Sequence, residues 1–160
     1  LTHFIHPTHQ LVKTQSSSER FTCDLCRNRG TGLHYQCRAC RFDLHEKCAE
    51  LPEKMSFFAH PWHDLHLQPA GSMSRICDLC MEPVQGFCYR CIPCNFDVHP
   101  ECSKMQQTVY TNFHPQHTLC LVPTSNCKCN ACNLINRHIW LYRCLNGPSS
   151  LFGWISRLFA

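Results

Sequence analysis

A pattern of histidines and cysteines occurs twice in this chain, in the same register and 54 residues apart. Each copy reads His-x2-His, Cys-x2-Cys, Cys-x2-Cys and His-x2-Cys, and these eight donors suffice for two tetrahedral zinc ions. A fixed period also decides the architecture, because each repeat forms one structural unit. The residues are His6, His9, Cys23, Cys26, Cys37, Cys40, His45 and Cys48, followed by His60, His63, Cys77, Cys80, Cys91, Cys94, His99 and Cys102.

Repeats of this size are not stabilised sufficiently by apolar burial alone. The 160 residues include 16 cysteines and 12 histidines, and a short repeat cannot bury a sufficient apolar core without a metal or a disulfide. Cys-x2-Cys pairs make strained disulfides but natural chelates, and a disulfide framework does not require histidines that recur in step with cysteines. The sequence therefore favours zinc over disulfides.

The period divides the chain into modules. Module one is expected over residues 2–52 and module two over residues 59–105, with linkers at 53–58 and 106–112. An incomplete module three is expected over residues 113–144, followed by a divergent tail at 145–160. The chain starts at Leu1 without an initiator Met, as is expected of a fragment or a mis-spliced product, and no secretory signal is visible.

Small zinc-stabilised α+β modules in tandem, with little conventional core, are the predicted fold. Each combines short antiparallel β pieces with one helical turn, placed at residues 45–51 and 99–105 because His-x2-Cys suits one face of a helix. Turns are expected at Thr31-Gly32 and at Gly86, and polar loops at residues 15–20 and 68–74.

Four ligand pairs per module can be combined in an interleaved or a sequential way. We favour interleaving, because it ties both ends of a short module to its middle. The first module then has one site of Cys23, Cys26, His45 and Cys48 and another of His6, His9, Cys37 and Cys40. The second has Cys77, Cys80, His99 and Cys102, and His60, His63, Cys91 and Cys94.

The third repeat breaks off after Cys144, where the next cysteine, histidine and cysteine are missing. A single site of His114, His117, Cys129 and Cys132 is one hypothesis, with Cys120 or Cys127 as substitutes. A partly disordered remnant is favoured over that site.

Other repeated positions have more than one interpretation. Phe42 and Phe96 are expected to form a miniature core. Asp43 and Asp97 are expected either to accept a hydrogen bond from a ligand histidine or to lie at the surface. Cys88 replaces His34, and packing is favoured over a role as a reactive thiol.

The combination of ligand spacings with the intervening Tyr35, Tyr89, Phe42 and Phe96 resembles the plant divergent cysteine/histidine-rich zinc module, the DC1 domain. That family is similar to the diacylglycerol-binding domain of protein kinase C, which has two interleaved zinc sites. The resemblance implies an intracellular plant protein, in the cytoplasm or nucleus, linked to stress or hormone signalling. Members are also often assigned a protein-disulfide reductase role.

A non-catalytic signalling module that binds a protein partner is the function favoured here. A thiol oxidoreductase using Cys-x2-Cys pairs is the alternative, although no βαβ pattern accompanies them. Diacylglycerol or other lipid binding is disfavoured because the corresponding loops are polar, and a PHD-like finger is disfavoured because it leaves every His-x2-His idle.

Charge and hydropathy remove two further classes. The formal charge is +4, and cysteine deprotonation on zinc binding lowers it to about +2. This charge disfavours nucleic acid as a partner, and no apolar stretch is long enough to span a membrane.

Overall fold

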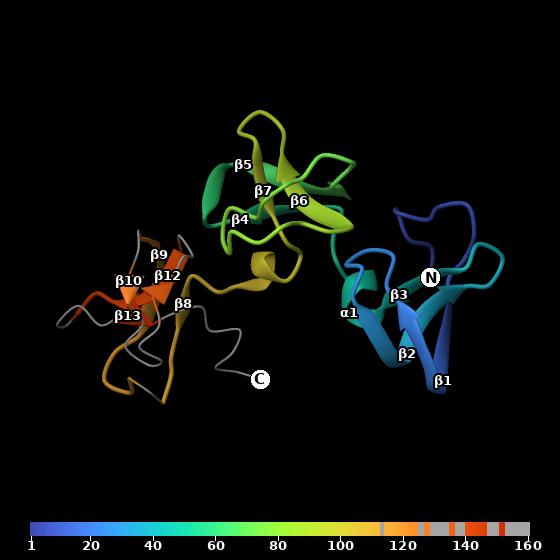
Figure 1. Ribbon diagram of the computed structural model, residues 1–160, viewed down its shortest axis with the longest axis horizontal. Coiled ribbons are helices and arrows are strands. Elements are labelled where there is room, and N and C mark those ends of the chain that lie inside the picture. Colours follow the sequence, from blue (N-terminus) through green and yellow to red (C-terminus); the bar gives the residue numbers. More distant parts are fainter. Residues whose placement is uncertain (113, 125–126, 129–134, 137–139, 147–150, 153–160) are drawn as a thin grey trace.

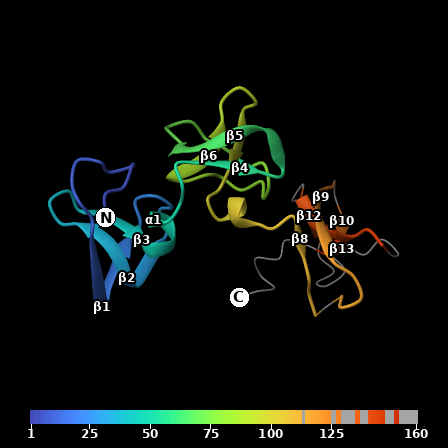
Figure 2. The ribbon, with the colours of Figure 1, turned by 180° about the vertical axis from the view of Figure 1, so that it is seen from behind.

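The computed structural model describes residues 1–112, 114–124, 127–128, 135–136, 140–146 and 151–152. The ribbon forms three lobes, one for each repeat, and module two lies between the other two (Figures 1 and 2). Every sheet within them is antiparallel, as the sequence predicts.

Each complete module is built on one small sheet. Module one has the order β1-β2-β3, formed by Val12–Thr22, Arg29–Cys37 and Phe42–His45. Module two has the order β4-β5-β6-β7, formed by Lys54–Phe57, His60–Pro69, Phe87–Cys91 and Phe96–Val98.

The third lobe repeats part of this plan. Its four-stranded sheet has the order β13-β12-β9-β8, formed by Leu151–Phe152, Trp140–Cys144, Leu119–Pro123 and Thr108–Val109. A separate pair joins β10 (Cys127–Lys128) to β11 (Ile135–Asn136).

Helix is almost absent from the described residues. The expected turns are reduced to α1 (Glu46–Ala49) and to the 3-10 turn η1 (Cys102–Lys104). The first turn cannot extend in either direction. His45 is the last residue of β3, and Pro52 disfavours helical backbone at Leu51. The fold is thus one of short strands with a minimal helical turn.

Two expectations about loops are wrong. Residues 15–20 lie within β1 instead of a loop, although the pairing with β2 shifts register between Ser16 and Phe21. The predicted turn at Thr31-Gly32 lies inside β2, where Gly32 pairs with Ser16. The glycine is used there for its positive φ of 82° beside the bulge, not to reverse the chain.

The expected linkers also contain strands. β4 pairs with β5 and β8 pairs with β9, so residues 54–57 and 108–109 are parts of sheets. A repeated backbone contact explains this: Met55 opposes Leu65 and Val109 opposes Leu119, while Leu1 and Leu11 exchange two hydrogen bonds of 2.8 Å. The repeated leucine is fully buried, and its burial draws the preceding segment onto the sheet.

The buried side chains form one apolar cluster that extends through all three lobes. Its largest members recur at equivalent positions, and cysteines contribute to it as well. The members buried almost completely include Leu11, Leu65 and Leu119, Leu25 and Leu79, Leu44 and Val98, and Tyr89 and Tyr142.

Modules one and two are joined by direct hydrogen bonds. The Phe87 amide donates to the Leu25 carbonyl at 2.8 Å, just after Gly86 turns the chain with a φ of 74°. The Tyr89 hydroxyl donates to the Pro52 carbonyl at 2.7 Å, and Tyr142 makes the equivalent bond to Gln106. These contacts fix module two against the Cys-x2-Cys turn of module one.

The hydrogen bond between Phe87 and Leu25 forms a joint between modules one and two, and Gly86→Ala is expected to break it. A Cβ at Gly86 would collide with the backbone carbonyl of Leu25, whereas at Gly32, which also has positive φ, it would meet open space. We predict that Gly86→Ala costs about 1–3 kcal/mol more stability than Gly32→Ala, measured by chemical unfolding. Equal costs, with the Phe87 amide still protected from hydrogen exchange, would contradict the joint.

Candidate metal centres

Each Cys-x2-Cys pair of the complete modules closes into a tight turn. The residue that follows the second cysteine has a left-handed backbone in every case, with φ between 50° and 61°. The Arg27 and Met81 amides donate to the Cys23 and Cys77 carbonyls at 2.9 Å, which closes the turn in each module. This geometry presents both sulfurs of a pair to one point. The left-handed residues are Arg27, Arg41, Met81 and Asn95.

Four clusters of four donors result, and within each cluster the ligand atoms lie within 4.8 Å of one another. The grouping is the interleaved one. In module one, the Cys-x2-Cys pair between β1 and β2 meets the His-x2-Cys pair that starts at the end of β3, and the N-terminal histidines meet the Cys-x2-Cys pair that starts at the end of β2. The clusters are Cys23, Cys26, His45 and Cys48; His6, His9, Cys37 and Cys40; Cys77, Cys80, His99 and Cys102; and His60, His63, Cys91 and Cys94.

The separations between donors suit zinc. Nitrogen and sulfur ligands of a tetrahedral zinc ion lie about 3.6 Å apart, given usual bond lengths of about 2.1 and 2.3 Å. The Nδ1 of His45 lies 3.4 Å from Cys26 Sγ and 3.7 Å from Cys48 Sγ. The Nδ1 of His99 lies 3.3 and 3.6 Å from the equivalent sulfurs, so both modules fit the ion equally well.

The second ring nitrogens indicate how the histidines are oriented. His99 donates from Nε2 to the Pro83 carbonyl at 3.1 Å, which leaves Nδ1 free to bind metal. By contrast, the Nε2 atoms of His6 and His60 are buried without a hydrogen-bond partner among the described residues. A buried ring nitrogen without a partner is costly, and a metal ion would remove that cost.

The thiols are close enough to compete for protons. Hydrogen bonding from Cys26 and Cys48 lowers the pKa of Cys23, and contact with Cys23 raises the pKa of Cys48. In module two, hydrogen bonding from Cys102 lowers the pKa of Cys77, while the Cys77 sulfur raises the pKa of His99 to about 10. Sulfurs this close together favour a thiolate, and thiolates are the form of cysteine that binds a divalent cation.

Aromatic and acidic neighbours hold the ligands in place. Phe42 stacks on His6 with ring centroids 4.7 Å apart, and Phe96 stacks on His60 at 4.8 Å. Asp24, inside the first Cys-x2-Cys turn, accepts a hydrogen bond from the Asp43 amide at 2.9 Å. Asp78 does the same for Asp97 at 2.7 Å, so the turns are tied to β3 and β7.

In one hypothesis, Asp43 and Asp97 accept hydrogen bonds from the ligand histidines. Their carboxylates have other neighbours. Asp43 lies 3.6 Å from the non-ligand His34, and Asp97 lies 3.4 Å from Arg75 and from Arg90. The sequence gives no sign of the actual partner of His99, because that partner is a backbone carbonyl.

In module three, His114 and His117 lie with Cys144. Cys144 takes the place that Cys91 has in module two, so the repeat itself points to this third ligand. Cys129, Cys132 and the substitute Cys127 cannot be placed in a site, because the first two lie outside the described residues and only the backbone of Cys127 is described. The four-ligand site proposed for this module stays a prediction.

The comparisons with known proteins identify the family. The model of a family described as the C1 domain matches residues 4–49 and 58–103, which is more than half of the chain. The chain belongs to the C1 domain family. Its two matches are tandem copies of the cysteine/histidine-rich DC1 type, as the resemblance implied. The family is generally non-enzymatic, and its members act in protein or lipid interaction.

One curated relative is a protein described as probable nucleoredoxin 1 from Arabidopsis thaliana. It is 45% identical over 47 residues, which is 29% of this chain and 8% of that protein. The chain thus matches less than a tenth of the length of this relative. No solved structure matches, and no helix among the described residues is long and apolar enough to cross a membrane.

Cys88 is expected to be inert. Its side chain is fully buried, it donates to Asp97 Oδ1 at 3.7 Å, and burial raises its pKa to about 12. We predict that iodoacetamide at pH 8 leaves Cys88 unmodified in the folded protein but modifies the half-buried Cys120, as measured by peptide mass spectrometry. Modification of Cys88 at the rate of Cys120 would contradict this assignment.

Proposed function

We propose that this chain is a zinc-binding interaction protein without catalytic activity, in which each complete module holds two zinc ions. The observation that carries the proposal is the closed donor set: each cluster of the complete modules supplies four nitrogen or sulfur atoms to one point. A four-ligand site leaves no position for water or substrate, which is typical of structural zinc and not of catalytic zinc.

We propose 2–52 and 59–105 as the ligand-bearing ranges of the two modules, while the sheet of module two begins earlier, at β4 (Lys54–Phe57). Every ligand of a cluster lies within its own range, so each range binds its ions without help from the next. The joint between Leu25 and Phe87 then fixes the relative position of two modules that are each stabilised by metal.

The surface of module two supports a protein partner. Trp62 and Ile92 are 74% and 67% exposed, and both line a groove of about 680 Å³. An exposed aromatic side chain beside an arginine, here Trp62 beside Arg90, is a composition enriched in protein interfaces. His63 and Cys91 line the same groove, so binding there depends on the metal cluster.

The alternative is a thiol oxidoreductase, which the match to a probable nucleoredoxin favours. Catalysis by Cys-x2-Cys needs one exposed nucleophile of low pKa and a resolving partner. Here each pair lies with two further ligands, and a bound zinc would occupy the thiolates.

Protein purified without chelators is expected to contain about four zinc ions in modules one and two. Since protons compete with zinc for thiolates, zinc should be retained at neutral pH and released as the pH falls, as measured with a zinc-sensitive dye. Metal-free protein that reduces insulin disulfides would contradict the proposal and support the oxidoreductase.

Cys91→Ser is expected to unfold module two while module one keeps its two zinc ions. Removing one thiolate leaves three ligands around the ion and places a buried hydroxyl in the small core of the module. Zinc content should fall by about two ions, since both clusters of the module share its fold. The matched control is Cys120→Ser, outside the complete modules. Unchanged zinc content and melting in Cys91→Ser would refute the ligand assignment.

A further inference from the structure

Module one has a groove that the zinc clusters do not account for. It has a volume of about 700 Å³ and lies on the face of the sheet that carries Thr14, His34, Gln36 and Asp43. Arg20 and Phe21 reach it from the far side of the bulge in β1. The size is that of a small-molecule site, and the lining is polar.

The floor of the groove offers a hydrogen-bond acceptor. His34 is buried, donates from Nδ1 to the Gly32 carbonyl at 2.9 Å, and is stacked on Phe21 at 4.2 Å. Its Nε2 lies 3.6 Å from Asp43 Oδ1, beyond hydrogen-bond distance. That oxygen is buried and has no hydrogen-bond partner among the described side chains and backbone. A donor from a ligand would satisfy it.

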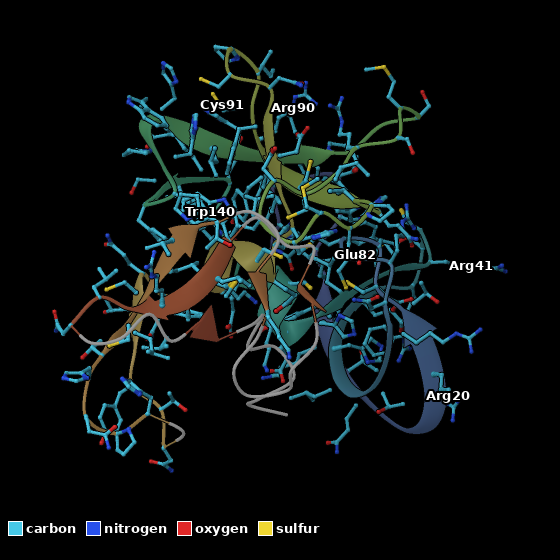
Figure 3. The ribbon with its side chains drawn as sticks, turned by 60° about the vertical axis from the view of Figure 1, so that its left-hand side comes forward. Arg20, Arg41, Glu82, Arg90, Cys91 and Trp140 are labelled. Atoms are coloured by element: carbon cyan, nitrogen blue, oxygen red, sulfur yellow. The ribbon has the colours of Figure 1, made fainter. Side chains whose placement is uncertain are left out.

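The rim of the groove is strongly basic. Arg20, Arg38 and Arg41 all line it, and none of them takes part in the ion pairs formed among the described side chains. Figure 3 shows Arg20 and Arg41 on the same outer side of module one. Three guanidinium groups around one groove present the forked donors that suit phosphate oxygens.

Module two shows that this charge is not required by the fold. The repeat places Ser74, Ile92 and Asn95 where module one has the three arginines. Asn95 even keeps the left-handed backbone of its counterpart, with a φ of 50° against 52° for Arg41. The arginines are therefore a property of module one alone, added to a shared metal-binding scaffold.

We propose that this groove binds a phosphorylated polyhydroxyl ligand, such as an inositol phosphate, with its phosphates on Arg20, Arg38 and Arg41 and a hydroxyl donating to Asp43 Oδ1. An acceptor at the floor and cations at the rim require one ligand to carry both donors and anionic groups. A plain anion would leave Asp43 unsatisfied, and an apolar lipid tail would meet polar walls. The inference rests on the proposed zinc-held module, which forms the groove.

The test uses the zinc-loaded full chain. Calorimetry with myo-inositol 1,4,5-trisphosphate measures soluble binding, and flotation with phosphatidylcholine vesicles containing phosphatidylinositol bisphosphate measures binding of the same headgroup on a membrane. The groove variant Arg38→Gln with Arg41→Asn removes two cations and keeps a residue suited to the left-handed position. The control, Lys47→Ala with Lys104→Ala, removes the same charge from exposed sites outside the groove.

The groove variant should weaken binding about a hundredfold, roughly tenfold per arginine, and the control at most about twofold. Binding in the soluble arm assigns a free ligand, and binding only to phosphoinositide vesicles assigns a lipid headgroup. Absence of binding in both arms, equal losses in both variants, or equal binding to phosphatidylserine vesicles of the same charge would overturn the inference. The zinc content is measured on the same samples. Four bound zinc ions without ligand binding would refute only the proposed ligand of the groove. Protein without zinc would refute the proposed function.

Discussion

The crossing of the ligand pairs is the constraint on which each complete module depends. One cluster joins the first Cys-x2-Cys turn to the end of the module, and the other joins its beginning to its middle. With zinc bound, neither end can leave without breaking a site worth roughly 10–16 kcal/mol at neutral pH. The small sheets and the few buried leucines are arranged by these ties, because apolar burial in units of this size is too small to do so alone.

Around this shared frame the two modules differ in what they present to solvent. Positions next to the ligands, such as Arg38 and Ile92, are not needed for metal binding and differ in charge and polarity between the repeats. Module one therefore presents a basic groove and module two a partly apolar one, with Trp62 at its edge. The hydrogen bond from the Phe87 amide to the Leu25 carbonyl connects the two modules directly.

The donor pairs and the antiparallel strands could be predicted, because metal ligands follow strict local spacings. How the pairs combine does not follow from those spacings, and interleaving is favoured only because it ties both ends of a short module to its middle. The strand through residues 15–20 could not be predicted, since its pairing with β2 depends on a bulge and its residues are polar. Similarly, β4 and β8 resembled linkers in the sequence, because segments this short become strands only when a buried leucine on the neighbouring strand anchors them. The groove of module one could not be predicted either, because Arg20 is separated from Arg38 and Arg41 by the whole of β2 and meets them only in the folded sheet.

Cadmium-113 NMR on the cadmium-substituted chain tests the crossing most directly, because scalar coupling to cysteine β-protons shows which thiolates share one ion. The account predicts that the ion coupled to Cys23 and Cys26 is also coupled to Cys48, and that a different ion is coupled to Cys37 and Cys40. Module two should show the same pattern with Cys77, Cys80 and Cys102. Coupling of one ion to Cys37, Cys40 and Cys48 together would mean sequential sites and would contradict the account.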